Sequence, residues 1–85
     1  MGNKMGQKAI VLINIEIGSE EEVLSQLTKI PNVKETYLVY GVYDIVAVIE
    51  ANTQDELREI VVKHVRRIPK VRSTTTMMVI EEHKK

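Results

Sequence analysis

Two short stretches of this chain gather the side chains that could bind a small molecule. Residues 40–44 read Tyr-Gly-Val-Tyr-Asp, with a carboxylate between two apolar runs, and residues 73–76 read Ser-Thr-Thr-Thr. A carboxylate in dry surroundings favours an ammonium partner, while hydroxyls and the free N–H groups of a turn can bind a carboxylate. Together the two stretches predict a site for an amino-acid zwitterion.

Each stretch also has an explanation that needs no ligand. Asp44 lies beside a turn, where a carboxylate commonly accepts hydrogen bonds from nearby backbone N–H groups. Threonine is enriched in strands because its branched side chain packs well there. The binding hypothesis therefore depends on the two stretches acting together.

Catalytic and metal-binding side chains are scarce. The chain has no cysteine, which excludes thiolate metal sites and cysteine nucleophiles. His64 falls on the apolar stripe of a predicted helix, where we expect a packed or partly buried side chain, and His83 lies in a polar tail. The sequence contains no HExxH motif and no acidic metal cluster. We therefore expect no cofactor, no metal and no enzymatic activity.

The charge balance argues against a nucleic-acid partner. The 12 basic and 12 acidic residues give a net charge of zero, whereas a nucleic-acid binder usually has a basic excess. The chain has no Phe or Trp on which bases could stack. Basic residues do cluster near the end of the second predicted helix, where cations complement the helix dipole: Lys63, Arg66, Arg67, Lys70 and Arg72.

A membrane partner is not expected either. The longest apolar runs, residues 9–13 and 45–49, are too short to cross a bilayer. The opening residues lack the apolar segment of a signal peptide. We expect a cytoplasmic protein.

The order of elements predicts the fold. Strands are expected at residues 9–17, 33–40, 42–50 and 71–81. Helices are expected to begin at the caps Ser19 and Thr53, each followed three residues later by a glutamate, and to end before Pro31 and Pro69. Residues 1–6 form a loose start and residues 83–85 a polar tail. This is one α+β domain over residues 1–85, a ferredoxin-like βαββαβ fold. Its four-stranded antiparallel sheet has strand order 4-1-3-2, with two helices on one face.

The predicted sheet is apolar on both faces. Along residues 45–49 every side chain is apolar, and residues 77–80 and 37–40 also offer apolar groups to both sides. Helices cover one face, and an identical sheet is the simplest cover for the other. We therefore expect a dimer through that face. In the predicted strand order the first strand separates Asp44 from the hydroxyls by about 10 Å. A shared pocket is then favoured where two subunits or two dimers meet.

The two stretches also resemble a known family. Residues 37–44 (YLVYGVYD) and 68–76 (IPKVRSTTT) are similar to the effector domain of the Lrp/AsnC, or feast/famine, transcription regulators, called the RAM domain. The marks are the G-x-Y/F-D turn, Pro-x-Val at the start of the last strand, and two threonines two positions apart. The resemblance runs from about Gln7 to Glu82.

The resemblance implies a non-enzymatic regulatory module. Such domains dimerise through their sheets, dimers commonly form an octamer of four dimers, and amino-acid effectors bind between dimers. Asp44 would take the effector's amino group, and turn N–H groups and threonine hydroxyls its carboxylate. The implied ligand-binding residues are Gly41, Val42, Tyr43, Asp44, Thr74 and Thr76.

Full-length members of the family carry an N-terminal helix-turn-helix domain, for which this chain has no room. The resemblance therefore implies a stand-alone RAM module without direct nucleic-acid binding, whose partners are further copies, a small amino-acid effector and a full-length Lrp/AsnC-type regulator.

Two other functions fit the same element order. A small dimeric α/β-barrel enzyme, monooxygenase-like, would need an enclosed cavity between helices and sheet. An ACT-type regulatory domain also binds amino acids, but it associates through sheet edges or helices.

Overall fold

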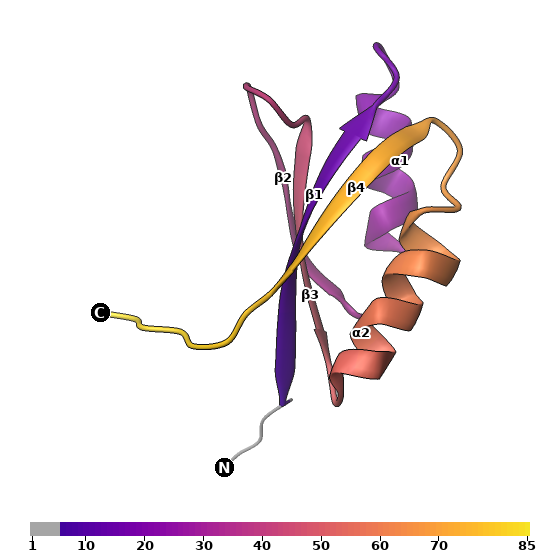
Figure 1. The fold of residues 1–85 in the computed structure, drawn as a ribbon. Helices are drawn as coiled ribbons and strands as arrows, with labels where there is room; N and C mark the ends of the chain where they lie inside the picture. The colour runs from indigo at the N-terminus through magenta and orange to yellow at the C-terminus, as the bar shows by residue number, and fades with distance from the viewer. Residues whose placement is uncertain (1–5) are drawn as a thin grey trace.

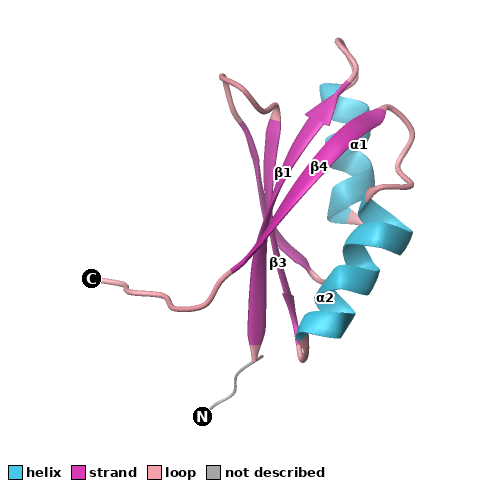
Figure 2. Ribbon diagram, viewed as in Figure 1, coloured by secondary structure: helices cyan, strands magenta, loops and turns pink. Residues whose placement is uncertain are grey.

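The computed structural model describes residues 6–85, and its elements follow the predicted order (Figures 1 and 2). The strands are β1 (Gln7–Ile15), β2 (Val33–Leu38), β3 (Ile45–Ala51) and β4 (Val71–Met78). The helices are α1 (Glu20–Thr28) and α2 (Gln54–Ile60), and α2 continues into a π-helical segment, η1 (Val61–Val65). The predicted loose start lies outside the described residues, apart from Gly6.

The sheet confirms the ferredoxin-like prediction. Its strand order is β2-β3-β1-β4, every neighbouring pair is antiparallel, and both helices lie on one face (Figure 1). Central strand β1 therefore separates β3, which follows the turn, from the hydroxyl-rich β4. The Val79 N–H still donates to the Lys8 carbonyl of β1 at 2.9 Å, and the chain after it leaves on the side away from the helices (Figure 1).

The core lies between the helices and alternate residues of the central strands. On β1 and β3 the buried side chains are two residues apart, as strand geometry requires. These rows pack against the buried faces of α1 and α2, and the core includes Val11, Ile13, Ala47, Ile49, Val23, Leu27 and Leu57. These side chains occupy the space between the helices and the central strands.

The other face of the sheet, which we call the open face, carries a second apolar row. Strand register places Ile10 beside both Val48 and Met77, and Leu12 beside Val46. In the single chain these side chains remain partly or largely accessible; Met77 is 44% exposed. The doubled apolar pattern expected from the sequence is therefore present on the folded sheet.

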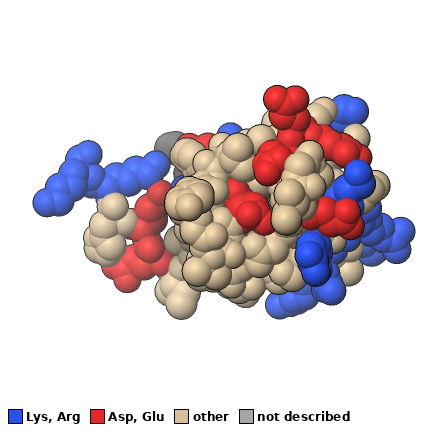
Figure 3. Space-filling model, turned by 90° about the horizontal axis from the view of Figure 1, so that it is seen from above, with Lys and Arg blue, Asp and Glu red and all other residues tan. Residues whose placement is uncertain are grey.

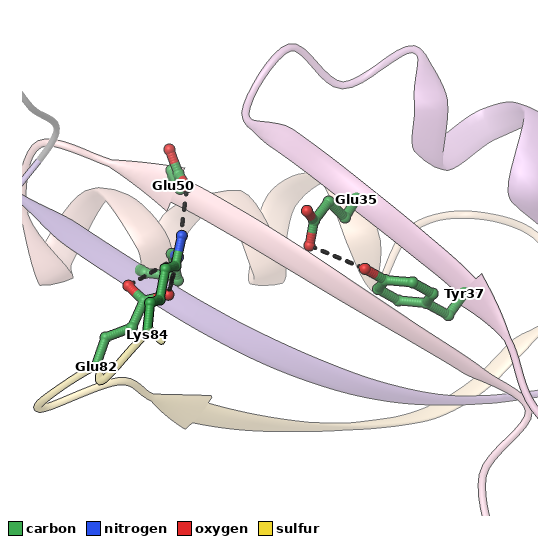
Figure 4. A network of polar contacts seen from close by, with 6 residues as sticks. Glu35, Tyr37, Glu50, Glu82 and Lys84 are labelled. Atoms are coloured by element: carbon green, nitrogen blue, oxygen red, sulfur yellow. Dashed lines mark hydrogen bonds and ion pairs between the residues drawn. The ribbon is translucent and has the colours of Figure 1, made fainter.

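One end of the open face is polar. The Lys8 ammonium lies 2.9 Å from the Glu82 carboxylate and 3.8 Å from that of Glu50, and Lys84 lies 3.6 Å from Glu82 (Figure 4). The hydrogen bond from Lys8 holds the pKa of the Glu82 carboxyl below its usual range. The open face thus combines an apolar centre with a charged margin, the arrangement common in protein–protein interfaces.

The two predicted helix caps behave differently. At α2 the Thr53 hydroxyl accepts a hydrogen bond from the Glu56 backbone N–H at 3.0 Å, as predicted. At α1 the prediction of a capping box is wrong. The Ser19 hydroxyl donates to the Glu16 carbonyl at 2.6 Å and makes no cap hydrogen bond, because the tight turn through Gly18 brings that carbonyl close.

Two other side chains depart from the pattern. His64 is exposed, not packed on the apolar stripe; it lies inside η1, where the helical period no longer has the value assumed for an α-helix. Ile17 is fully exposed, because β1 ends at Ile15 and the chain turns before the alternation reaches position 17.

The proline turns that follow the two helices are not equivalent. In the second, the Val71 N–H donates to the Ile68 carbonyl at 3.2 Å, and Lys70 has a φ of 79°. That angle suits the third residue of a type II turn, a position that favours glycine. In the first, Asn32 keeps a negative φ, and its side-chain amide donates to the Glu50 carbonyl at 2.9 Å. Lys70 is therefore the strained member of the pair.

Replacing Lys70 with glycine should stabilise the fold. Relief of the left-handed strain outweighs the added flexibility of the unfolded chain, for a net gain of about 0.5–1 kcal/mol in the free energy of unfolding. Asn32→Gly is the matched control and should lose about 1 kcal/mol with its hydrogen bond. Urea denaturation at one protein concentration measures both. Equal destabilisation of the two variants would contradict this account of the turns.

Candidate functional site

Asp44 makes three hydrogen bonds to the backbone, two with the central strand β1 and one with Val39, just after β2. Its backbone N–H donates to the Ile13 carbonyl at 3.0 Å, and its carbonyl accepts from Val39 N–H at 2.9 Å. Its side-chain Oδ2 accepts the Ile15 N–H at 2.9 Å. The carboxylate thus continues the β1–β3 pairing beyond the point where β3 begins. The sequence analysis allowed a hydrogen bond to nearby turn N–H groups, but the donor to the carboxylate lies 29 residues away, on β1.

The same geometry leaves half of the carboxylate available. Within residues 6–85, Asp44 Oδ1 has no hydrogen-bond donor, and the side chain is partly exposed. A group held by its backbone and one oxygen presents the other oxygen in a fixed direction. Asp44 can therefore bind an ammonium group without giving up its structural hydrogen bond.

The turn before Asp44 is prominent on the surface. Tyr40 and Val42 are almost fully exposed, at 106% and 85%, and Gly41 has a φ of 154°, a backbone conformation that other residues rarely adopt. Tyr43 points back toward the sheet, where its hydroxyl lies 3.3 Å from the Thr75 hydroxyl. The hydroxyl run therefore contacts the turn through Thr75, a residue outside the predicted site.

Asp44 shares a hollow of about 430 Å³ with Asn14, Arg72 and Ser73. The β1–β4 register shifts at this point, so that Asn14 pairs with Ser73 and Ile15 with Val71, which leaves Arg72 as an extra residue. Such a bulge re-aims side chains and is frequent beside binding sites. The sequence analysis assigned Arg72 to a solvated basic cluster. A bulge depends on pairing between distant strands, so no local signal marked it.

Thr74 and Thr76 lie elsewhere. They pair with Ile13 and Val11, whose side chains are in the core, and so belong to the helix-facing side of β4. There they line a groove of about 400 Å³ between the helix and the outer strand, together with Arg58, Val62, Arg66 and Met78. We call this the helix–edge groove. Within one copy, the predicted residues form two separate groups: the 41–44 turn and the two threonines.

In Figure 3, acidic side chains lie over the middle and upper part of the molecule, while basic side chains gather mainly at its two ends. Within residues 6–85 no group of three or more His, Asp or Glu side chains is arranged to hold a metal ion. In the same residues no helix is long and apolar enough to span a membrane.

Comparison with known proteins places these features in a family. The model of the Lrp/AsnC ligand binding domain matches residues 8–85. The HTH-type transcriptional regulator FL11 of Pyrococcus horikoshii is 36% identical over 76 residues, which are 89% of this chain and 50% of that protein. The chain spans about half the length of the curated relatives it matches.

Solved structures agree with the fold. The crystal structure of FFRP-DM1 superposes with a TM-score of 0.84 at 35% identity, over 88% of this chain and 100% of that one. The NMB0573/L-Met complex from Neisseria meningitidis has a TM-score of 0.86 at 17% identity, over 95% of this chain and 54% of that regulator, a likeness of fold alone.

The chain belongs to the Lrp/AsnC family, as a ligand-binding (RAM) domain. Its full-length relatives are transcriptional regulators, and effector binding by a regulatory domain is the general role that this membership supports.

The two roles of Asp44 can be separated by substitution. Asp44→Ala removes the acceptor of the Ile15 N–H and should lower the free energy of unfolding by about 1–2 kcal/mol. Asp44→Asn keeps a side-chain oxygen and should cost less than about 1 kcal/mol, while it removes the charge. Urea denaturation compares the two. Equal losses for the two variants would mean that a neutral side-chain oxygen at position 44 adds no stability through the Ile15 hydrogen bond.

Proposed function

We propose that this chain is a non-enzymatic regulatory module that binds an amino-acid effector where copies of the domain meet. The observation that carries the proposal is Asp44, whose carboxylate is held by the Ile15 N–H through one oxygen and is accessible through the other. It stands at the G-x-Y-D turn of a domain whose family is defined by ligand binding. One related fold, NMB0573, was solved as a complex with L-Met.

In this proposal the two groups of site residues come from different copies. The turn, residues 41–44, supplies the Asp44 carboxylate, which binds the effector's ammonium group. Backbone N–H groups of the same turn bind the effector's carboxylate. Thr74 and Thr76 of a neighbouring copy supply hydroxyls for the effector's carboxylate, and within residues 6–85 these hydroxyls have no hydrogen-bond partner. Separation of the groups within one chain favours a site between chains.

Assembly through the open face is the second part of the proposal. The apolar row around Ile10, Leu12 and Val48, bordered by the Lys8 ion pairs, suits a second copy of the same face. Dimers formed in this way would leave the outer edges of β4 and the exposed turn residues Tyr40 and Val42 outside the interface. Further dimers can then associate there, up to an octamer of four dimers, or with a full-length regulator of the same family.

Regulation follows from where the ligand sits. A ligand bound between dimers stabilises only the arrangement that contains its site, and so it shifts the assembly equilibrium by its differential affinity. A module of this kind changes transcription by altering the association of a DNA-binding partner.

The open-face dimer can be tested with one charge. Val48→Lys places an ammonium at the centre of the apolar row and should convert the protein to a monomer of 9.7 kDa in multi-angle light scattering. Ile17→Lys, a change at an exposed apolar residue outside the sheet, should leave the assembly unchanged. A wild-type protein that is already monomeric at micromolar concentration would refute this part of the proposal.

Effector binding can be tested by thermal shift against the twenty amino acids. At about 100 times its dissociation constant, a ligand adds about 2.7 kcal/mol to the stability of the folded protein. Asp44→Asn should abolish the shift while keeping the wild-type mass in light scattering. No response to any amino acid, or a full response in Asp44→Asn, would refute the proposed binding role.

A further inference from the structure

The helix–edge groove has a composition that selects one end of a ligand. Its polar side chains are the guanidinium groups of Arg58 and Arg66 and the hydroxyls of Thr74 and Thr76, and no carboxylate lines it. Two cations and two hydroxyls stabilise a bound anion and repel an ammonium group. The lining therefore favours the carboxylate end of a zwitterion over its ammonium end.

The two arginines are not equally available. Arg58 donates to the Asp55 carboxylate at 3.1 Å, one turn away on the same helix. Arg66 has no ion-pair partner within residues 6–85 and is exposed. A carboxylate entering the groove meets an unneutralised guanidinium at Arg66, which can hold it through two parallel N–H donors.

The rest of the groove is apolar. Val62 is 46% exposed on the helix side, and Met78 is partly buried on the strand side. Burying a charged side chain against these groups would cost its hydration, whereas an aliphatic or thioether side chain gains from the contact. The groove therefore favours a ligand with an apolar substituent beside its carboxylate.

The helix backbone is irregular beside the helix–edge groove. The helix changes here from α to π geometry, with the Arg66 N–H donating to the Val61 carbonyl at 2.8 Å. The π segment forms the last turn of the helix, so that the helix ends beside the groove. Val62 lies within this segment and Arg66 caps its end.

We infer that Arg66 is the carboxylate-binding residue for the effector, and that the effector is an amino acid with an uncharged, apolar side chain. This inference rests on the proposed function, because the effector's ammonium group must be taken by Asp44 of an adjacent copy. Arg66 acts in this site together with the threonine hydroxyls, and Val62 and Met78 contact the effector's side chain.

The chain offers a matched control at the next position. Arg67 is also exposed and has the same charge, but it does not line the groove. Isothermal titration calorimetry with L-leucine and L-methionine should show a dissociation constant at least about tenfold higher for Arg66→Gln than for wild type, the usual cost of losing a charge-assisted hydrogen bond. Arg67→Gln should stay within about twofold. Light scattering of both variants establishes that the assembly is intact.

A second comparison keeps the protein unchanged and alters the ligand. Leucinamide lacks the carboxylate and should bind wild-type protein at least about tenfold more weakly than L-leucine, and L-lysine should bind more weakly than either L-leucine or L-methionine. Equal affinities of Arg66→Gln and Arg67→Gln, or of leucinamide and L-leucine, would overturn the inference while Asp44-dependent binding of amino acids still held. Absence of any amino-acid binding would overturn both the inference and the proposed function.

Discussion

The alternation of apolar side chains along two central strands is the constraint on which the rest of the molecule depends. On β1 and β3 one row of side chains is buried under the helices, and the intervening row forms the open face. The buried row holds α1 and α2 in place and so determines where the helix–edge groove lies. The second row cannot be covered by the chain's own helices, because both lie on the opposite face (Figure 1). In the proposed function another copy covers this row, so the same strand pattern would underlie both folding and assembly.

Asp44 connects this framework to ligand chemistry. The Asp44 carboxylate is attached to the backbone of the central strand through Oδ2. Because this hydrogen bond already orders the Asp44 side chain, less side-chain entropy would be lost when an ammonium group binds. The same bond explains why a charged residue can stand next to the buried strand residues Ile13 and Ile45 without an unsatisfied backbone group at Ile15. Structural and binding roles are compatible because the carboxylate has two oxygens.

The separation of the turn from Thr74 and Thr76 gives the domain its regulatory potential. If one chain held both halves of the site, effector binding would have no consequence for assembly. With the two halves supplied by different copies, as proposed, binding of the effector would be coupled to assembly, and the coupling would be reciprocal: assembly would also strengthen binding. In the inferred site, the composition of the helix–edge groove would decide which amino acid produces the effect. Arg66, Val62 and Met78 would then set specificity, whereas Asp44 would recognise the ammonium group that all amino acids share.

The sequence by itself determined the order of elements, the ferredoxin-like class, the doubled apolar pattern and the turn that carries Asp44, because period-two alternation, capping at Thr53 and proline stops are local signals. It did not determine the hydrogen bond of Ser19, whose hydroxyl donates to the Glu16 carbonyl. It also did not determine that His64 and Ile17 are exposed, because the α-helical and strand periodicities stop before these residues. Only the tertiary structure decided that Thr74 and Thr76 face the helices while Ser73 and Arg72 share the hollow of Asp44. The reason is that the register of β4, and the bulge at Arg72 within it, is set by hydrogen bonds to β1, a strand more than fifty residues earlier in the chain, and no local pattern in β4 specifies which neighbour it will meet.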